Sequence, residues 1–553
     1  KKRLMGPGWL EIRPPAGATH SLSRGDSLSW CALELEVDSP ESIVNINDPK
    51  VIRQRWSVAS AAAATDEAAE HTAMDVSADP TDEPSASAGG TSATSATAAT
   101  TAASTSAGGS SATAATTAAK AAKKRAAAAA SFKAPPPPKL RAASVHVCTV
   151  MHQQKQVNEV VMISVLYHPE VSVDGPTAMD RGQLQQWTGV RRFEVPGTPF
   201  PLNFGEAATA QRVQVDLFAQ EAQLLGVFLA KLCELDVDVL IGHNFMGYDL
   251  DVLLHRMREH RVPNWSQLGR LRRKQFPKLQ AGGGGQGDTT WAERQVMSGR
   301  LVCDTYLTCR EHLREKNYSL KQLAHSQLQV QRMQEPGGPS GVARCFGAVD
   351  NLIYLVRYSQ QSASLQMRLT FKLLFLPLTR ELATLVGNRW ERCLGGARSE
   401  RVEYLLLHKF SELGYVVPDK QFSRKGAHSG RRKKPAYTGG LVLEPKIGFY
   451  DKAVLLLDFN SLYPSIIREF NICFTTVKRD PIDEAAGESA VALNAQPPPR
   501  DLPDGVLPSV IAHLVNTRAG VKTEIKRVSR FEPSAHKRLT LDQLDIRQKA
   551  LKL

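Results

Sequence analysis

The chain has 553 residues, and its 69 Lys and Arg against 55 Asp and Glu leave a net charge of +14. A hydrophobic content of 42% excludes a wholly disordered protein, and apolar runs such as Val454–Leu457 are far shorter than the ~20 residues that cross a membrane. The excess of positive charge indicates an anionic partner, which is either nucleic acid or an acidic membrane surface.

The cysteines and the N-terminal residues indicate the compartment. None of the eight cysteines forms a CxxC pair, which argues against a zinc ribbon and against a disulfide scaffold and favours the cytosol or the nucleus. The first residues, KKRLMGPGWLEIRPP, lack the apolar core of a signal peptide. They also lack an initiator Met, so we expect the chain to be a fragment.

Changes of composition divide the chain into five regions. Residues 1–58 have a globular composition, whereas 59–139 are rich in Ala, Thr, Ser and Gly without a helical apolar stripe, and we expect this insert to be disordered. Periodic sequence resumes in 140–386 and continues through 387–500. Residues 501–553 are charged and helical in period, with a break around Phe531–Ser534.

The periodicity of 140–386 predicts a mixture of strands and helices. Strands are expected at Val157–His168 and Val237–Ile241, and helices at Ala222–Leu235 and from about Leu250 onward. A mostly apolar helical stretch, Leu365–Gly387, is expected to break near Pro377.

The most informative segment begins with the apolar run Val454–Leu457, which predicts a strand buried on both faces. Asp458 follows at once, where a carboxylate can face a divalent cation, and oxygen ligands suit Mg²⁺. The turn Phe459–Tyr463 leads into a helix with Pro464 in its first turn, where backbone amides favour phosphate. From the spacing alone, a carboxylate that merely caps the turn is an equal alternative.

The sequence DFNSLYPSII resembles motif A of the family B DNA polymerases, and its extension EFNICFTTV is similar to the alpha-type catalytic subunits of eukaryotes. The resemblance covers nearly the whole chain except the insert. The other segments that carry it, in chain order, are GPGWLEI, IGHN, RSERVEYLLLHKF, VPDKQ, YTGGLVLEPKIGFYD, LPSVIAHLVNTRAGVK and DIRQKALKL.

The resemblance implies a mixed α/β multidomain fold. Residues 1–58 would end an N-terminal domain, and 140–386 would form a ribonuclease H-like exonuclease domain. Residues 387–500 would be part of the palm of a right-hand polymerase, and 501–553 the helical fingers, truncated within motif B.

The resemblance also implies roles for the motif A residues. Asp458 would be the first catalytic aspartate and a ligand of two Mg²⁺ ions that activate the primer 3′-hydroxyl and hold the triphosphate. Phe459, Ser461 and Leu462 would contact the phosphates. Tyr463 would be a steric gate against the 2′-hydroxyl of ribonucleotides, although alone it could equally be a core tyrosine.

Three cations further along resemble the nucleotide-binding residues of the fingers. Arg518 and Lys522 lie four residues apart on one helix face, which alone is usually a solvated face. In the family such residues grip the incoming triphosphate, and Lys552 resembles the lysine that opens motif B. The rest of motif B and the second catalytic aspartate would lie beyond this chain, so we expect that the chain alone does not polymerise.

Other segments could follow DNA. Tyr437, Gly439 and Gly440 resemble the YxGG motif that follows the template backbone, where glycines allow close approach of phosphate; a hairpin turn is a compatible reading. The basic stretches Arg270–Lys274 and Ser423–Lys434 could face DNA phosphates or be solvated loops.

The exonuclease region lacks the acids that its reaction needs, because two metal ions require several carboxylates. IGHNFMGYD supplies Asp249, but the strand of the first motif reads SVHVCTVMH, without an acid. In the third motif, Tyr358 is followed by Ser362 where the acid belongs. We therefore expect an inactive remnant without proofreading, in which Asp249 caps its helix and Asp304 is a turn residue.

Together these features imply a DNA-directed DNA polymerase catalytic subunit, a nuclear nucleotidyltransferase that uses Mg²⁺ to add dNTPs to primer 3′-ends. It would initiate replication by extending RNA primers on a DNA template, with primase subunits and an accessory B subunit as partners and no membrane. Two alternatives remain open: another family B polymerase with an active exonuclease, and a non-catalytic DNA-binding scaffold that keeps the polymerase fold.

Overall fold

The computed structural model describes residues 10–12, 21–22, 27–31, 34–37, 43–45, 137–152, 154–180, 182–194, 199–279, 290–417, 441–459, 461–477, 498–530 and 535–553. Residues 59–136 of the expected insert therefore lie outside the described residues. The chain divides into two compact units, of which the second contains all residues from Pro138 onward together with Leu22–Glu34. In the first unit, β1 (Leu10–Ile12) pairs antiparallel with β4 (Ile43–Asn45). The short strands β2 and β3 span Ser21–Leu22 and Leu35–Glu36.

The second unit is built on a six-stranded sheet with the order β10-β9-β5-β6-β7-β8. A long antiparallel hairpin of β5 and β6 forms its centre; β7 extends it antiparallel on one side, and β9 and β10 run parallel to β5 on the other. The strands are β5 (Leu140–His152), β6 (Val157–Val171), β7 (Gln185–Arg191), β8 (Asp216–Phe218), β9 (Val239–Gly242) and β10 (Leu301–Asp304). The strands predicted at Val157–His168 and Val237–Ile241 are thus confirmed.

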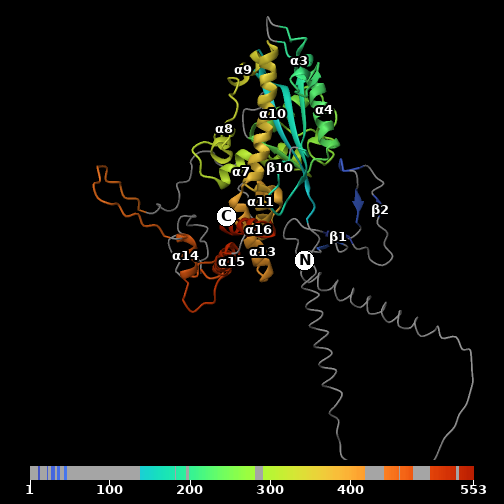
Figure 1. Ribbon diagram of the computed structural model, residues 1–553. Helices are drawn as coiled ribbons and strands as arrows, with labels where there is room; N and C mark the ends of the chain where they lie inside the picture. The colour runs from blue at the N-terminus through green and yellow to red at the C-terminus, as the bar shows by residue number, and fades with distance from the viewer. Residues whose placement is uncertain are drawn as a thin grey trace, which may run out of the picture. The chain divides into compact units, whose positions relative to one another are not determined.

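Helices cover both faces of this sheet (Figure 1). Side chains of a strand alternate between its faces, and accordingly Val145 and Val147 of β5 pack with helices α4 (Glu221–Glu234) and α5 (Leu250–Glu259). Cys148 and Val150 instead pack with α10 (Val349–Lys372). The helices predicted at Ala222–Leu235 and from Leu250 are confirmed by α4 and α5.

The remaining helices surround this core or follow it in sequence. The predicted break near Pro377 lies earlier, at Leu374, whose left-handed φ of 55° separates α10 from α11. Pro377 is in the first turn of α11, where proline is tolerated. The break predicted around Phe531–Ser534 in the C-terminal helical region lies outside the described residues. The helices are α3 (Phe204–Ala210), α6 (Trp291–Arg294), α7 (Thr305–His312), α8 (Leu320–Leu323), α9 (Gly338–Cys345), α11 (Phe375–Val386), α12 (Trp390–Leu394), α13 (Arg398–Glu412), α14 (Leu462–Glu469), α15 (Val506–Ser529) and α16 (Ala535–Lys552).

Shorter helical turns connect these elements. They are the π-helical turns η2 (Phe245–Asp249) and η5 (Ala324–Leu328) and the 3₁₀ turns η3 (Trp265–Leu268) and η4 (Gln295–Met297). Within the described part of the chain, every helix is too short or too polar to span a bilayer.

A buried carboxylate joins four elements of the sheet and its helices. Glu221, at the start of α4, is 2% exposed and accepts a hydrogen bond from the Val160 amide of β6 (2.8 Å). Arg256 of α5 donates to both of its oxygens (2.9 and 2.7 Å), and Arg191 of β7 donates to Oε2 (3.2 Å). Burial alone would raise the pKa of Glu221, but the Arg256 guanidinium outweighs it and holds that pKa below its usual value.

We predict that Glu221→Ala lowers the free energy of unfolding by about 3–5 kcal/mol, because it leaves two guanidinium groups of the network without their shared carboxylate. Urea titration of the variant and the parent protein measures the difference. Glu234→Ala is the matched control: this carboxylate is 63% exposed and paired with Lys231 on the same helix, and we expect its loss to cost about 0.5 kcal/mol or less. Equal costs for the two variants would contradict the prediction.

Candidate functional site

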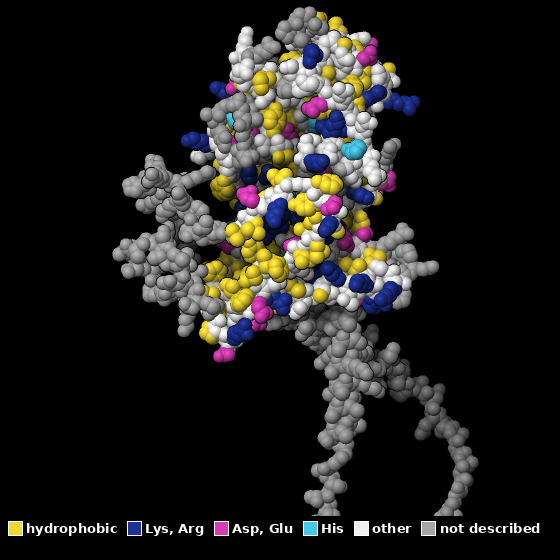
Figure 2. Space-filling model, turned by 90° about the vertical axis from the view of Figure 1, so that its left-hand side faces the viewer, with side chains coloured by type: hydrophobic (Ala, Val, Ile, Leu, Met, Phe, Trp, Pro, Cys, Tyr) yellow, Lys and Arg dark blue, Asp and Glu magenta, His cyan; other side chains and the backbone are white. Residues whose placement is uncertain are grey.

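The segment that leads to Asp458 is extended and exposed. The structure assigns no helix or strand to the described residues 441–459, and Leu455 and Leu456 are 81% and 90% exposed. Figure 2 shows the side of the molecule on which α14 lies in Figure 1. Hydrophobic side chains gather on the lower part of this side. The prediction of a buried strand at Val454–Leu457 is therefore wrong for this structure. A strand needs a neighbour for its backbone groups, and none of the described residues pairs with this segment.

The turn after Asp458 has the predicted form. Ser461 adopts a left-handed conformation (φ 59°) directly before α14, and Pro464 lies in the first turn of this helix, as expected. The Phe459 and Tyr463 rings are 76% and 78% exposed. The alternative of a core tyrosine at position 463 is not supported, because its ring faces solvent.

The residues after α14 attach it to α15. The Asn471 side chain accepts a hydrogen bond from the Gly505 amide (2.8 Å) and donates to the Pro503 carbonyl (3.1 Å). Cys473 is buried in an apolar cluster with Phe410 of α13 and Val506 of α15. A Cβ atom at Gly505 would lie 2.5 Å from that of Cys473, so the two segments meet at a glycine. The sequence analysis did not identify this joint, of which Asn471 and Cys473 belong to the EFNICFTTV extension.

The predicted triphosphate-binding cations lie on α15 and α16. Arg518 is half-buried and Lys522 is exposed on α15, next to the buried Val521, and Lys552 is exposed at the end of α16. Among the described residues, no hydrogen bond or ion pair joins these cations to Asp458. The predicted DNA-following residues Tyr437, Gly439 and Gly440, and the basic stretch 423–434, lie outside the described residues.

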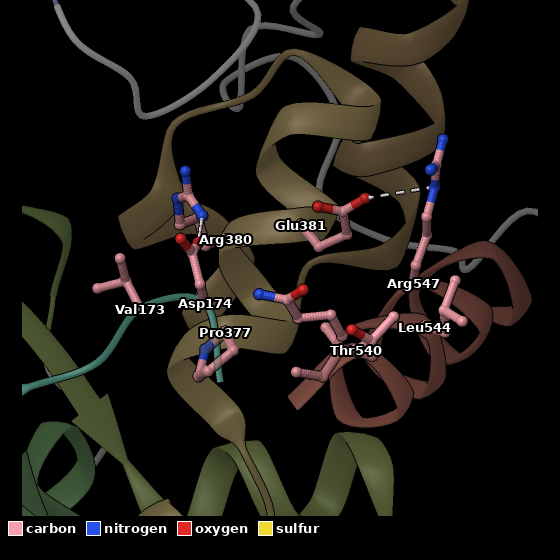
Figure 3. Close-up of a pocket in the computed structure, with 10 residues that line it drawn as sticks. Val173, Asp174, Pro377, Arg380, Glu381, Thr540, Leu544 and Arg547 are labelled. Atoms are coloured by element: carbon pink, nitrogen blue, oxygen red, sulfur yellow. Dashed lines mark hydrogen bonds and ion pairs between the residues drawn. The ribbon is translucent and has the colours of Figure 1, made fainter. Parts of the chain in front are cut away.

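Helix α16 is held against α11, and a cleft of about 310 Å³ lies beside their contact (Figure 3). Leu382 of α11 and Ile546 of α16 belong to a small apolar cluster between the helices. On the walls of the cleft, Arg380 donates to Asp174, and the Arg547 Nε atom lies 3.9 Å from Glu381 Oε1 (Figure 3). The charged groups of this cleft thus lie near partners of opposite sign, and the contact anchors the helix that carries Lys552.

The basic stretch Arg270–Lys274 makes contacts within the chain. Arg270 Nη2 lies 2.7 Å from Asp236 Oδ1 and 2.8 Å from Asp238 Oδ1, and the Arg272 guanidinium stacks 4.4 Å over the Trp30 ring. These contacts favour neither a free solvated loop nor a phosphate-binding face.

Side chains of β5 and α10 pack against one another in the interior of the second unit. The His146 Nδ1 atom is 3.0 Å from Ser359 Oγ, and the His146 ring meets the Tyr358 ring edge-on with centroids 5.8 Å apart. Cys148, two residues along the same strand, is 5% exposed, and Ser362 is fully buried on α10. Thus two non-acidic residues of the strand expected to carry the first motif, His146 and Cys148, face the helix that carries Ser362 of the third motif.

Two aspartates nearby have roles other than those predicted. The Asp249 side chain makes no capping hydrogen bond, so its predicted capping role is wrong. Asp304, predicted as a turn residue, instead caps α7. Its side chain accepts hydrogen bonds from the amides of Tyr306 (3.0 Å), Asn244 (2.9 Å) and Met246 (2.9 Å). Burial raises the pKa of Asp304, although its amide bonds oppose the rise. Burial, with a smaller effect from Asp304, raises the pKa of Asp249 well above its usual value.

Comparison with known proteins agrees with this arrangement. The model of DNA polymerase family B matches residues 388–553, and the model of the exonuclease domain of that family matches residues 115–323. The chain belongs to the family B DNA polymerases. The resemblance inferred from motif A is thereby confirmed.

Three relatives, each named DNA polymerase alpha catalytic subunit, illustrate the similarity. The chain is 39% identical over 456 residues to the protein of Oryza sativa subsp. japonica, covering 74% of this chain and 28% of that protein. It is 40% identical over 425 residues to the Xenopus laevis protein, with the same coverages. For the Mus musculus protein the identity is 37% over 427 residues, covering 73% and 28%. The chain thus spans about 28% of the length of these relatives.

The side chains between β5 and α10 do not fit the metal ions that a family B exonuclease domain implies. Among the described residues, no group of three or more His, Cys, Asp or Glu side chains is placed to hold a metal ion. Asp304 already accepts four backbone amides, from Asn244, Met246, Tyr306 and Leu307. Asp249 is then a single carboxylate with a raised pKa, which is a poor ligand set for two divalent cations.

We predict that Asp249→Asn stabilises the protein at neutral pH. Because the pKa of Asp249 is higher in the folded protein, the parent protein loses stability as the pH rises above ~4, where the unfolded carboxyl ionises. The variant has no carboxyl group at this position and does not lose stability in this way. The difference in free energy of unfolding between variant and parent should therefore grow between pH 4 and 7 and reach at least ~1 kcal/mol.

Urea titrations across this pH range measure the difference, and Asp501→Asn, at an exposed turn, is the control with no such trend. A variant that is less stable than the parent protein at pH 7 would show that Asp249 is held there by a favourable partner.

Proposed function

We propose that this chain is part of the catalytic subunit of a DNA-directed DNA polymerase that adds dNTPs to primer 3′-ends and initiates replication by extending RNA primers. The observation that carries the proposal is the motif A segment from Asp458 through α14, joined by Asn471 and Gly505 to the helix that bears Arg518. This whole segment lies within the residues matched by the polymerase family model. The relatives named as catalytic subunits favour a catalyst over a non-catalytic scaffold.

Asp458 would be a carboxylate ligand of Mg²⁺ in a two-metal site. Exposed carboxylate oxygens suit this ion, which keeps substrate phosphates among its ligands. When bound, the metal pair lowers the pKa of the primer 3′-hydroxyl and neutralises charge on the triphosphate.

The chain's own residues would bind and orient the nucleotide. The turn of Phe459, Ser461 and Leu462 precedes α14 and would present its amides to the phosphates. Arg518 would bind a phosphate through two parallel N–H groups, whereas Lys522 and Lys552 would act as point charges.

We further propose that 140–386 is a ribonuclease H-like domain that does not proofread. In support, its sheet combines a central antiparallel hairpin with β9 and β10 parallel to β5. Where β5 faces α10 and the reaction would need carboxylates, the side chains are those of His146, Cys148 and Ser362. The expected boundaries of the N-terminal domain, insert, palm and fingers belong to the same proposal.

The proposed partners follow from the replication role of the relatives. They are a DNA template and an RNA/DNA primer, with Tyr437, Gly439 and Gly440 following the template, together with primase subunits and an accessory B subunit, in the nucleus. The net charge of +14 supports a polyanionic substrate.

We predict that Asp458→Asn in the natural full-length protein lowers the rate of primer extension at least ~100-fold, because it removes a ligand of ions worth several kcal/mol in the transition state. Gel-based extension of a labelled RNA-primed template measures the rate. Asp451→Asn, at an exposed carboxylate of the same segment, should leave it within about twofold. Undiminished extension by Asp458→Asn would show that the metal assignment is wrong.

We predict that Tyr463→Ala raises the incorporation of ribonucleotides relative to deoxynucleotides at least ~10-fold, since the ring that excludes the 2′-hydroxyl is removed. Competition between rNTP and dNTP in single-nucleotide extension gives the ratio. Tyr450→Ala, which removes another exposed ring of the same segment (59% exposed), serves as the control. An unchanged ratio in Tyr463→Ala would assign the discrimination to another residue.

A further inference from the structure

One arginine contacts the helix that packs on β5. Arg332 lies in the loop between η5 and α9, and its Nη2 atom donates to the Tyr358 hydroxyl (2.6 Å) and to Ser362 Oγ (2.9 Å). Its guanidinium also stacks over the Tyr358 ring, 4.6 Å from the centroid. Three contacts thus hold this cation against α10. The sequence analysis did not single it out, because the loop has no periodicity and matches none of the motifs.

The groups around Arg332 are held neutral. Burial, together with smaller effects from the charge of Arg332 and from His243, lowers the pKa of His146 to about 3. Burial, again aided by Arg332, lowers the pKa of His243 to about 4. Both imidazoles are therefore uncharged at neutral pH. The partners of His146, which are Ser359 of α10 and Cys148 of β5, are also neutral.

The position of Arg332 coincides with the residues that replace the expected acids. Ser362, where the third motif would have its acid, is a direct hydrogen-bond partner of the guanidinium. His146 and Cys148 lie two residues apart on β5 and face the same helix. A carboxylate at position 362 would lie within reach of Arg332 and form an ion pair with it, so it would not be available to a metal ion. The positive charge of Arg332 would also repel a divalent cation placed between β5 and α10, where the neighbouring side chains are buried.

We propose that Arg332 is the permanent cation of the interface between β5 and α10: it takes the place of the metal ions and prevents their binding even where carboxylates are restored. The proposal rests on the assignment of this domain as an exonuclease remnant. It goes beyond the missing acids, because it makes a residue outside all three motifs responsible for the exclusion of metal.

A double-mutant cycle tests the pairing without any catalytic readout. In the presence of Arg332, Ser362→Asp should keep or raise the melting temperature, because the new carboxylate pairs with the guanidinium. In the Arg332→Gln background the same change should lower it by about 4 °C or more, since a buried carboxylate is left without a cation. Additive effects of the two substitutions would overturn the proposal.

Metal binding tests the exclusion directly. The acid-restored variant His146→Asp, Cys148→Glu, Ser362→Asp is prepared in an Asp458→Asn background, which removes the proposed polymerase ligand. It is compared with the same variant carrying Arg332→Gln or Arg332→Lys in addition. Electron paramagnetic resonance of free Mn²⁺ gives the affinity. We expect Arg332→Gln to tighten Mn²⁺ binding at least ~10-fold, whereas Arg332→Lys, which keeps the positive charge, should leave it nearly unchanged.

Equal affinities with and without Arg332→Gln, including no binding by either form, would overturn the proposal. If the acid-restored variants fail to fold, as judged by circular dichroism, the double-mutant cycle decides. Neither experiment depends on primer extension, so a failure here would leave the proposed polymerase function unaffected. Conversely, a polymerase-inactive protein could still show the Arg332 effects.

Discussion

The central hairpin of β5 and β6 is buried on both faces, and much of the second unit depends on this constraint. Polar side chains on such strands require partners inside the protein, because an unpaired buried polar group is costly. Ser144 Oγ donates to Gln366 Oε1 (3.0 Å), and Ser164 Oγ lies 3.2 Å from Thr188 Oγ1. His146 is paired in the same way with Ser359. These buried polar side chains of β5 and β6 thus form neutral pairs, and Arg332 adds an anchored charge beside the pair of His146 and Ser359.

Local patterns predicted those elements whose formation depends mainly on local sequence. The apolar run of β6 and the amphipathic period of α4 were recognisable because the order of apolar residues along each element matches the side chains that it buries. The strand predicted at Val454–Leu457 is absent, and composition could not reveal this, since a strand forms only when another strand pairs with it and none of the described residues does so. Long motifs, by contrast, carried the assignment of the family.

The candidate sites were predictable to a smaller extent. Asp304 caps α7 and also binds the amides of Asn244 and Met246, some sixty residues earlier, so its role depends on a tertiary contact that no spacing reveals. Asp249 has the sequence position of a cap, yet its side chain makes no such bond. Arg332 reaches α10 from a loop without periodicity. The residue types of motif A were recognisable in the sequence, but the contacts of Asn471 and Cys473 with Gly505 depend on the tertiary structure.

That joint has a consequence for how the sequence can vary. Because a methyl group at position 505 would collide with Cys473, the two positions are not independent in evolution or in a mutant library. Because the collision is with the Cβ atom of Cys473, only glycine at 473 would relieve it. The Asn471 side chain bonds the Gly505 amide and so fixes the same loop. Covariation between 473 and 505 would therefore record the spacing of two helices, independently of any selection on nucleotide binding.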